Sequence, residues 1–213
     1  MSTHPARGRR TARLSADAVV ATAIRLARSE GLAAVSMRRL ADESGVSPMA
    51  LYRHVADRAD LLLRMLDAVA DELAPPPTGG TPRQRLTVVM HDMYDTFRRD
   101  PWVVQVLATE GLASTRVLPV LEAVFAAFAD AGVEPVRARD AYAMLFSFVF
   151  GETLVAHHDH ADSQARSMMR AIDPARYPHL SAVIASSAPP GVRDRERFAG
   201  NLELLLDGVL GVD

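Results

Sequence analysis

The sequence contains no cysteine, which excludes disulfide bonds and thiolate metal sites. It contains no lysine either, so all 24 basic residues are arginines. No apolar run approaches the roughly 20 residues of a membrane-spanning helix, and the longest one, Ala141–Val149, is interrupted by Ser147. The N-terminus lacks the apolar segment and the small-residue cleavage site of a signal peptide. We therefore expect a soluble, cytoplasmic protein with no membrane partner.

Charge is distributed unevenly along the 213 residues. The net charge is −2 overall, but residues 1–60 carry a net charge of +4 and the remainder carries −6. This arrangement is typical of a protein that binds a polyanion only through its N-terminal part. Residues 1–14 have no hydrophobic period, and we expect a flexible basic arm that contains Arg7, Arg9, Arg10 and Arg13. Such an arm either enters a minor groove of DNA or is only a solubilising tail.

A helical period of apolar residues continues through most of the remaining chain, and no segment shows sustained strand alternation. The fold class is therefore predicted to be all-α. Helices are expected at about 15–31, 36–45, 47–55, 57–73, 82–99, 101–109, 115–131, 135–160, 174–187 and 193–211. The proline-rich and glycine-rich segment 75–82 predicts the domain boundary. A three-helix domain with a connecting fourth helix, residues 15–73, then precedes a larger helical domain, residues 82–213.

Residues Ser36–Val55 (SMRRLADESGVSPMALYRHV) have the spacing of two helices joined by a tight turn. Ala41 is small where two helices cross closely, and Gly45 supplies the turn four residues later. Val46 and Leu51 are expected to fill the space between the two helices, with Leu40 packing from the other side, so that the pair forms one rigid unit. A second helix braced in this way can enter the major groove of DNA. The same spacing also fits an ordinary helical hairpin.

Residues 15–73 as a whole resemble the DNA-binding domain of the TetR family of repressors. The resemblance covers a first helix, the helix-turn-helix with its Leu-Tyr-x-His-Val ending, and the start of a fourth helix after Asp57. The C-terminal part is similar in layout to the tetracycline-repressor-like subgroup. Residues 202–208 (LELLLDG) weakly resemble the last helix of that subgroup. The resemblance implies a homodimer that binds double-stranded DNA at a palindromic operator and responds to a small-molecule effector.

The resemblance also implies the residues that contact DNA. Arg38 matches a position that reaches a base edge, where arginine can bind guanine through two hydrogen bonds. Tyr52, His54 and Arg58 match phosphate-contacting positions. The start of the recognition helix carries small or apolar side chains, so thymine methyl groups and groove shape are expected to contribute to specificity. The full expected set is Ser36, Arg38, Ser47, Pro48, Met49, Ala50, Tyr52, Arg53, His54 and Arg58. For two of these residues the sequence also allows a role without DNA: Tyr52 can be part of the core, and Arg53 can simply be solvated.

The C-terminal domain is expected to pair two chains and to bind the effector. Segments 140–160 and 194–210 are expected to form a four-helix bundle with those of a second chain, through Leu145, Glu152, Val155, Phe198, Leu202, Leu205, Leu206 and Val209. The apolar residues of these two segments are equally consistent with a core within one chain. An apolar effector pocket is expected around His91, Tyr94, Phe97, Trp102, Gln105, Met144 and Phe148.

No cofactor or metal is expected. The His and the Glu that hold the drug–Mg²⁺ chelate in tetracycline repressors correspond to Gln105 and Val155 here, which argues against tetracycline as the effector. A metal-dependent helical enzyme is a rival interpretation, through His157, His158, Asp159, His160 and Asp162. This cluster lacks the His-Glu-x-x-His spacing, and the chain has no glycine-rich phosphate loop or nucleophile elbow. We expect a ligand-released repressor and not an enzyme; a ligand-independent regulator or an activator also fits the sequence.

Overall fold

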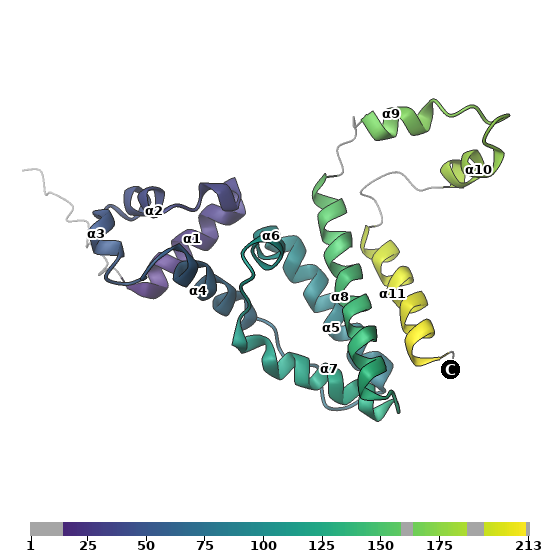
Figure 1. Cartoon of the computed structure of the whole chain (residues 1–213), viewed down its shortest axis with the longest axis horizontal. Coiled ribbons are helices and arrows are strands. Elements are labelled where there is room, and N and C mark those ends of the chain that lie inside the picture. Colours follow the sequence, from purple (N-terminus) through teal and green to yellow (C-terminus); the bar gives the residue numbers. More distant parts are fainter. Residues whose placement is uncertain (1–14, 159–163, 187–193, 212–213) are drawn as a thin grey trace, which may run out of the picture. The chain divides into compact units, whose positions relative to one another are not determined.

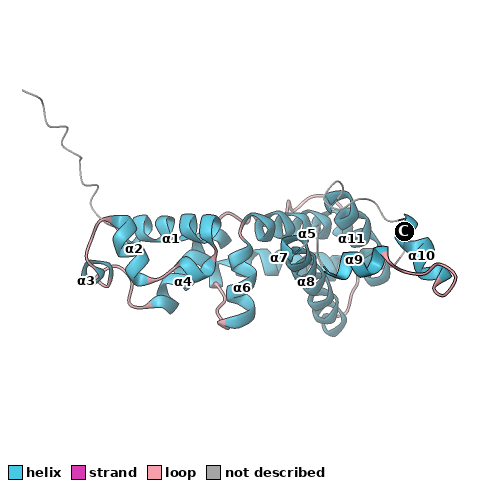
Figure 2. Cartoon of the chain, turned by 90° about the horizontal axis from the view of Figure 1, so that it is seen from above, coloured by secondary structure: helices cyan, strands magenta, loops and turns pink. Residues whose placement is uncertain are grey.

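The computed structural model describes residues 15–158, 164–186 and 194–211, and within these ranges all regular secondary structure is helical (Figure 2). The all-α prediction is confirmed. The chain divides into two compact units, one that extends to Ala68 and one that begins at Val69. The first domain is predicted to end at residue 73, whereas this division falls within the fourth helix. The predicted basic arm, residues 1–14, lies outside the described residues.

The first unit contains α1 (Ala16–Glu30), α2 (Met37–Ser44), α3 (Pro48–Leu51) and most of α4 (Arg58–Ala70), with a 3₁₀ turn at Leu32–Ala34. Three serines begin the first three helices, because each side chain accepts a hydrogen bond from the backbone N–H three residues later; they are Ser15, Ser36 and Ser47. Fully buried side chains from all four helices form one core, among them Val19, Ala23, Leu40, Leu51, Leu61 and Met65.

Helix α3 is shorter than the predicted segment 47–55. It ends at Leu51, whose carbonyl accepts hydrogen bonds from the N–H groups of both His54 and Val55. These bonds close a turn that leads the chain into α4, and Val55 is buried there. The recognition segment is therefore a single helical turn followed by a tight bend.

In the second unit, α5 (Pro82–Arg99) packs against four other helices (Figure 1). These are α6 (Pro101–Thr109), α7 (Leu118–Asp130), α8 (Pro135–His158) and α11 (Asp194–Leu210). Thr81 and Gln84 form a capping box at its start. Because α5 is covered on several sides, its buried side chains are spread around the helix: Leu86, Val89, Met90, Met93, Tyr94, Thr96 and Phe97.

The corner between α5 and α6 is held by a buried carboxylate. Asp100 is fully buried and accepts hydrogen bonds from Trp102 Nε1 at 2.9 Å and from Arg99 Nε at 2.8 Å. Arg99 also pairs with Glu72, with an Nη2–Oε2 distance of 2.6 Å. Both oxygens of this buried carboxylate therefore have a charged or polar donor, as burial requires.

Helices α8 and α11 lie side by side and run in opposite directions (Figure 1). Between them along the chain are two short helices, α9 (Gln164–Arg170) and α10 (Pro178–Ser186). The sequence pattern predicts a single helix in this region, at 174–187, and does not predict α9. Asp173 explains the late start of α10, because its side chain accepts a hydrogen bond from the N–H of Ala175 and its carbonyl accepts one from Tyr177. Pro178 then begins the helix.

Candidate nucleic-acid interface and ligand region

The turn between α2 and α3 fixes the two helices against each other. Gly45 has φ +65°, in the left-handed region that favours glycine, and the N–H of Val46 donates to the carbonyl of Ala41 at 3.0 Å. Ala41 and Leu51 are fully buried at the crossing. The packing inferred from the sequence spacing is present, and it leaves the opposite side of α3 free to face outward.

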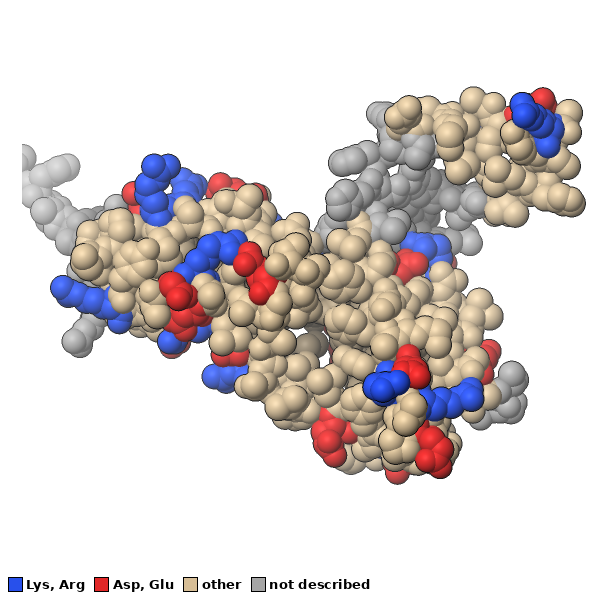
Figure 3. Space-filling model, in the orientation of Figure 1, with Lys and Arg blue, Asp and Glu red and all other residues tan. Residues whose placement is uncertain are grey.

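The residues expected to contact DNA lie on this outward side. Met49 is 71% exposed and Tyr52 is 49% exposed, while Leu51 between them is fully buried. Most of the others are exposed as well: Ser36, Arg38, Ser47, Pro48, Arg53 and Arg58, whereas Ala50 and His54 are half-buried. Arginine side chains project from the end of the unit that carries α2 and α3 (Figure 3). Tyr52 is thus a surface residue and not part of the core.

Two neighbouring arginines on α2 have different surroundings. Arg39 forms ion pairs with Glu30 at 3.1 Å and with Glu43 at 3.0 Å. Arg38 is exposed and makes no ion pair with any residue that the structure describes. Arg39 therefore links α2 to the end of α1, whereas the guanidinium of Arg38 remains available to an external partner.

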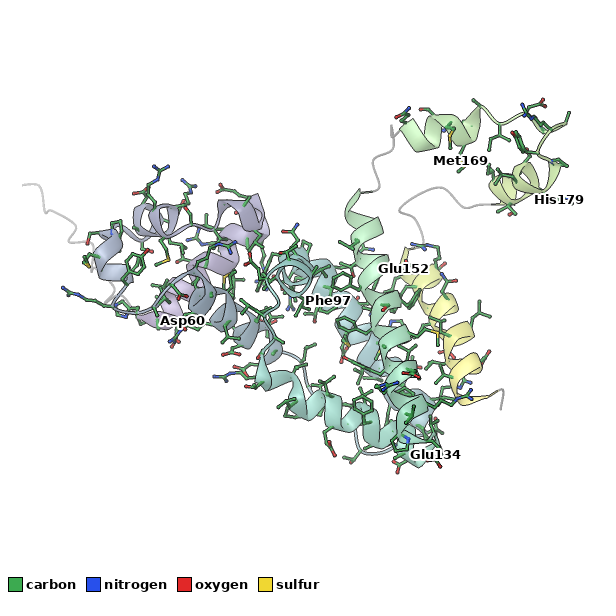
Figure 4. The ribbon with its side chains drawn as sticks, in the orientation of Figure 1. Asp60, Phe97, Glu134, Glu152, Met169 and His179 are labelled. Carbon is green, nitrogen blue, oxygen red and sulfur yellow. The ribbon has the colours of Figure 1, made fainter. Side chains whose placement is uncertain are left out.

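The start of α4 is held by a reciprocal pair of aspartates. Asp57 Oδ1 accepts from the N–H of Asp60 at 2.8 Å, and Asp60 Oδ2 accepts from the N–H of Ala56 at 2.8 Å. Arg64, one turn later, donates to Asp60 Oδ1 at 2.8 Å; Figure 4 labels Asp60 on α4. The hydrogen bond from Ala56 is the largest cause that holds the pKa of the Asp60 carboxyl below its ordinary value, and Arg64 adds to it against the opposing effect of burial.

Replacing Asp60 with Asn is expected to destabilise the protein by about 1 kcal/mol at pH 7, the typical cost of losing a helix-capping interaction. Because the pKa of Asp60 is lowered on folding, its contribution is present above the unfolded pKa and is lost as the pH falls through the folded value. Urea unfolding at pH 7 and at pH 3 measures this difference. Asp42→Asn, on exposed α2, is the matched control; an equal loss in both variants contradicts the assignment.

The residues expected to line an effector pocket lie in five different places. His91, Tyr94 and Phe148 surround Phe198 in a group of rings that we call the Phe198 cluster, in which Tyr94 stacks on Phe198 with centroids 3.9 Å apart. Tyr94 and Phe198 are buried, whereas His91 and Phe148 are half-buried. Trp102 is held by Asp100 at the α5–α6 corner. Gln105 is exposed on α6, and Met144 is 48% exposed on the outer side of α8. Of the seven, Phe97 alone belongs to a second group of rings.

This second group, which we call the aromatic row, contains Phe97, Phe125, Tyr142, Phe146 and Phe150. Ring centroids are 5.5 Å apart for Phe125–Tyr142, 6.0 Å for Tyr142–Phe146 and 5.9 Å for Phe146–Phe150. Phe97, labelled in Figure 4, meets Phe146 edge-on at 6.2 Å. The spacing of 142, 146 and 150 places these rings on one side of α8. That spacing was the sequence signal that the pocket prediction did not use.

Most residues expected at the dimer interface are covered within their own chain. Leu145, Phe198, Leu202 and Leu206 are fully buried, and Val209 is nearly so. Glu152 of α8, labelled in Figure 4, accepts a hydrogen bond from Arg197 of α11 at 2.9 Å. Leu205 is half-buried, and the side chain of Val155 lies outside the described part. The buried side chains form the core between α5, α8 and α11, so most of the expected interface residues are covered without a second chain.

The residues of the rival enzyme interpretation are not described, since the side chains of His157 and His158 and all of residues 159–163 lie outside the described part. Among the described residues, no group of three or more His, Asp or Glu side chains is placed to hold a metal ion. No helix in the described ranges is both long and apolar enough to cross a membrane.

Comparison with known families identifies both halves of the chain. Residues 74–212 match the family described as tetracyclin repressor-like, C-terminal domain, and residues 19–65 match the bacterial regulatory proteins of the tetR family. HTH-type transcriptional repressor DrrR1 of Streptomyces coeruleorubidus is 27% identical over 96% of this chain and 80% of its own length. An HTH-type transcriptional regulator of Saccharopolyspora erythraea is 31% identical over 71% of this chain and 66% of its own length.

Solved structures share the fold. ActR of Streptomyces coelicolor in complex with actinorhodin has a TM-score of 0.77 at 24% identity and covers 93% of this chain and 96% of its own. BioQ with its double-stranded DNA operator has a TM-score of 0.64 at 22% identity, over 94% of this chain and 100% of its own. With both halves of the sequence matched, the chain belongs to the TetR family of bacterial DNA-binding transcriptional regulators.

Proposed function

We propose that this protein is a homodimeric repressor that binds a palindromic operator and leaves it when a small hydrophobic molecule binds the C-terminal unit. The observation that carries the DNA-binding part is the outward surface of α3. Met49 and Tyr52 are large, exposed side chains on a helix whose Leu51 is fully buried. Arg38 and Arg53 lie beside them and form no ion pair with the described residues, and an exposed apolar patch of this kind is typical of an interaction surface. Its position in a helix-turn-helix favours the major groove of DNA as the partner.

Each part of this surface has a distinct proposed role. Arg38 reads a base edge, since its guanidinium has no competing carboxylate among the described residues. The side chains of Met49 and Ala50 contact thymine methyl groups. Tyr52, His54 and Arg58 contact phosphates, which fixes the register of the helix on the duplex but carries no sequence information. The hydroxyl groups of Ser36 and Ser47 already accept backbone hydrogen bonds at the starts of α2 and α3. Their proposed role is to fix these two helix starts in the orientation that faces the DNA.

The proposed dimer surface, which we call the glycine face, consists of Ala143, Ser147 and Gly151 on α8 and Gly200, Leu204 and Gly208 on α11. Leu204 is 71% exposed, and its neighbours on this face are small. A Cβ atom added to any of the three glycines meets nothing within 4 Å. Glycine within a helix costs about 1 kcal/mol relative to alanine, and no contact with the described residues explains that cost. Close approach of a second chain's helices does explain it.

Replacing both Gly200 and Gly208 with Ala is expected to stabilise α11 and to weaken the dimer at least tenfold. The helix gains because alanine is the better helix former, and the dimer loses because the new methyl groups keep the helices apart. Sedimentation velocity over a range of protein concentrations measures the dimer constant. Leu204→Ala should also weaken the dimer, whereas Leu118→Ala on α7, where Leu118 is 56% exposed, should not. A dimer unchanged by the glycine variant contradicts the assignment.

The effector response is proposed as a shift between two conformations of the dimer. To change occupancy of the DNA-binding state from 99:1 to 1:99, a ligand must prefer the released state by about 5.5 kcal/mol. Ligand-bound structures of ActR, with actinorhodin and with (S)-DNPA, support a ligand-responsive C-terminal unit in this chain.

The decisive experiment is a fluorescence anisotropy titration of the purified protein against the DNA that flanks its own gene, with a shuffled duplex as control. A specific, salt-dependent affinity supports the proposal. If affinity for both duplexes is equal, the operator-binding proposal is wrong. If specific binding does not change with any bound ligand, the protein is a ligand-independent regulator.

A further inference from the structure

The methionines of this chain differ widely in how far they reach solvent. Met65 and Met90 are fully buried, and Met93 is 7% exposed. Met49 is 71% exposed, more than any other methionine that the structure describes. The chain contains no cysteine, so no thiol competes with these thioethers for an oxidant. Because an oxidant must reach the sulfur, Met49 is the methionine most open to oxidation in the described ranges.

The position of Met49 makes its apolar character important. It lies on α3, where Leu51 is fully buried and faces the core while Met49 faces outward. Its neighbours in the chain, Pro48 and Ala50, have no polar side-chain atom, and Ala50 is half-buried. Met49 is therefore the largest exposed side chain of this helical turn, and it is apolar. In the proposed complex with DNA it lies against thymine methyl groups.

Oxidation would reverse that apolar character. A hydroperoxide transfers its terminal oxygen to Sδ of Met49, so that an S–O bond forms as the O–O bond breaks and the sulfur loses two electrons. The leaving oxygen takes up the hydroperoxide proton and departs as an alcohol, or as water when the oxidant is hydrogen peroxide. The product, methionine sulfoxide, is polar and is reduced back to the thioether by methionine sulfoxide reductases. A sulfoxide oxygen covered by a thymine methyl group loses its hydrogen bonds with water, which weakens the complex.

We propose that Met49 is a reversible oxidation site, at which a hydroperoxide forms methionine sulfoxide and thereby lowers the affinity for the operator. This inference rests on the proposed function, because the sulfoxide acts through the proposed contact between Met49 and DNA. It adds a second release signal that acts on the DNA-binding unit itself. Bound operator covers Met49, so oxidation takes place on the DNA-free protein and prevents it from binding again.

The first measurement follows oxidation at individual methionines. The full-length protein is treated with hydrogen peroxide, with or without the operator duplex, and is then cleaved after its arginines. Residues 40–53 form one peptide, in which Met49 is the sole methionine. Mass spectrometry should show that the operator slows the oxidation of Met49 and leaves that of Met168, 59% exposed on α9, unchanged. Equal rates at Met49 with and without the operator contradict the inference.

The second measurement is the operator affinity of the oxidised protein, by fluorescence anisotropy after the peroxide has been removed. Oxidation of the wild-type protein is expected to lower the affinity about tenfold or more, the order expected when a polar group is covered without a hydrogen-bond partner. Incubation with the two methionine sulfoxide reductases, one for each sulfoxide epimer, should restore the original affinity.

Three variants assign the effect to one sulfur atom. Met49→Leu has no thioether at this position, so peroxide should leave its affinity at the value measured before treatment. Met49→Gln, which has a polar side chain of similar length, should bind the operator more weakly than the wild-type protein without any oxidant. Met168→Leu is the matched control, since it removes an exposed thioether from the C-terminal unit, and it should lose affinity on oxidation as the wild-type protein does.

The inference is overturned if the wild-type protein keeps its operator affinity when Met49 is fully oxidised, or if Met49→Leu loses as much affinity on oxidation as the wild type. Far-UV circular dichroism before and after treatment checks that each protein is folded. The affinity of the untreated protein separates this inference from the proposed function. If no specific affinity exists before treatment, the repressor proposal is wrong; if specific affinity exists and survives oxidation, only the oxidation site is wrong.

Discussion

Arg38→Ala is expected to lower affinity for the operator by about 1–3 kcal/mol, which corresponds to about 5- to 150-fold in the dissociation constant per chain. The reason is that a guanidinium bound to a guanine edge makes two hydrogen bonds, and alanine leaves both base acceptors without a donor. Arg38 has no ion pair to break within the described part of the protein, so the loss should appear in DNA binding and not in stability. Fluorescence anisotropy at one fixed salt concentration measures the effect.

Arg39→Ala is the matched control, since it removes the same charge from the next position of the same helix. Arg39 is held by Glu30 and Glu43, so its loss should change operator affinity by less than threefold. The dependence on salt separates two roles for Arg38. A base contact leaves the slope of log affinity against log salt unchanged and relaxes specificity, whereas a phosphate contact lowers the slope by about one unit. Equal losses in the two variants would contradict the assignment of Arg38.

Phe198→Ala is expected to destabilise the C-terminal unit by about 3–5 kcal/mol, the usual cost of removing a buried aromatic ring. Phe198 lies between Tyr94 and Phe148, with ring centroids 3.9 Å and 5.2 Å away, and is fully buried. The rings come from three helices, so one deletion loosens the contacts that join α5, α8 and α11. Urea unfolding followed by circular dichroism measures the loss, with Leu118→Ala as an exposed control.

The same experiment distinguishes a core role from an interface role for Phe198. If Phe198 lay between two chains, which is one of the two roles that its sequence pattern allows, the destabilisation would depend on protein concentration, because dissociation would accompany unfolding. A core residue gives nearly the same loss of free energy at every concentration. A loss below about 1 kcal/mol would contradict the core role.

The DNA-binding half could be predicted closely because its signals are local. Ser36 and Ser47 begin helices with hydrogen bonds that span three residues, and Gly45 supplies a turn that only a few residue types tolerate. Such features are present in the sequence itself. The structure therefore adds mainly the contrast between Arg38 and Arg39, which depends on Glu30 from another helix.

The C-terminal half could not be predicted to the same depth. Helix α8 is apolar on nearly every side, so its sequence does not indicate which side packs on α5, which packs on α11 and which stays exposed. Phe148 and Phe146 are two residues apart, yet the first belongs to the Phe198 cluster and the second to the aromatic row. These assignments depend on Phe198 and Phe97, which are distant in the chain. Gly151, Gly200 and Gly208 lie within helices, and their positions in the sequence are a signal for the exposed side of α8 and α11 that the prediction did not use.

The corner held by Asp100 gives the protein an internal optical reporter. Trp102 is the single tryptophan of the chain and is 1% exposed, so intrinsic indole emission comes entirely from one shielded site beside a carboxylate. A change in emission therefore records movement at the junction of α5 and α6, without any attached dye. The regulator thus carries its own spectroscopic probe next to the segment that follows α4.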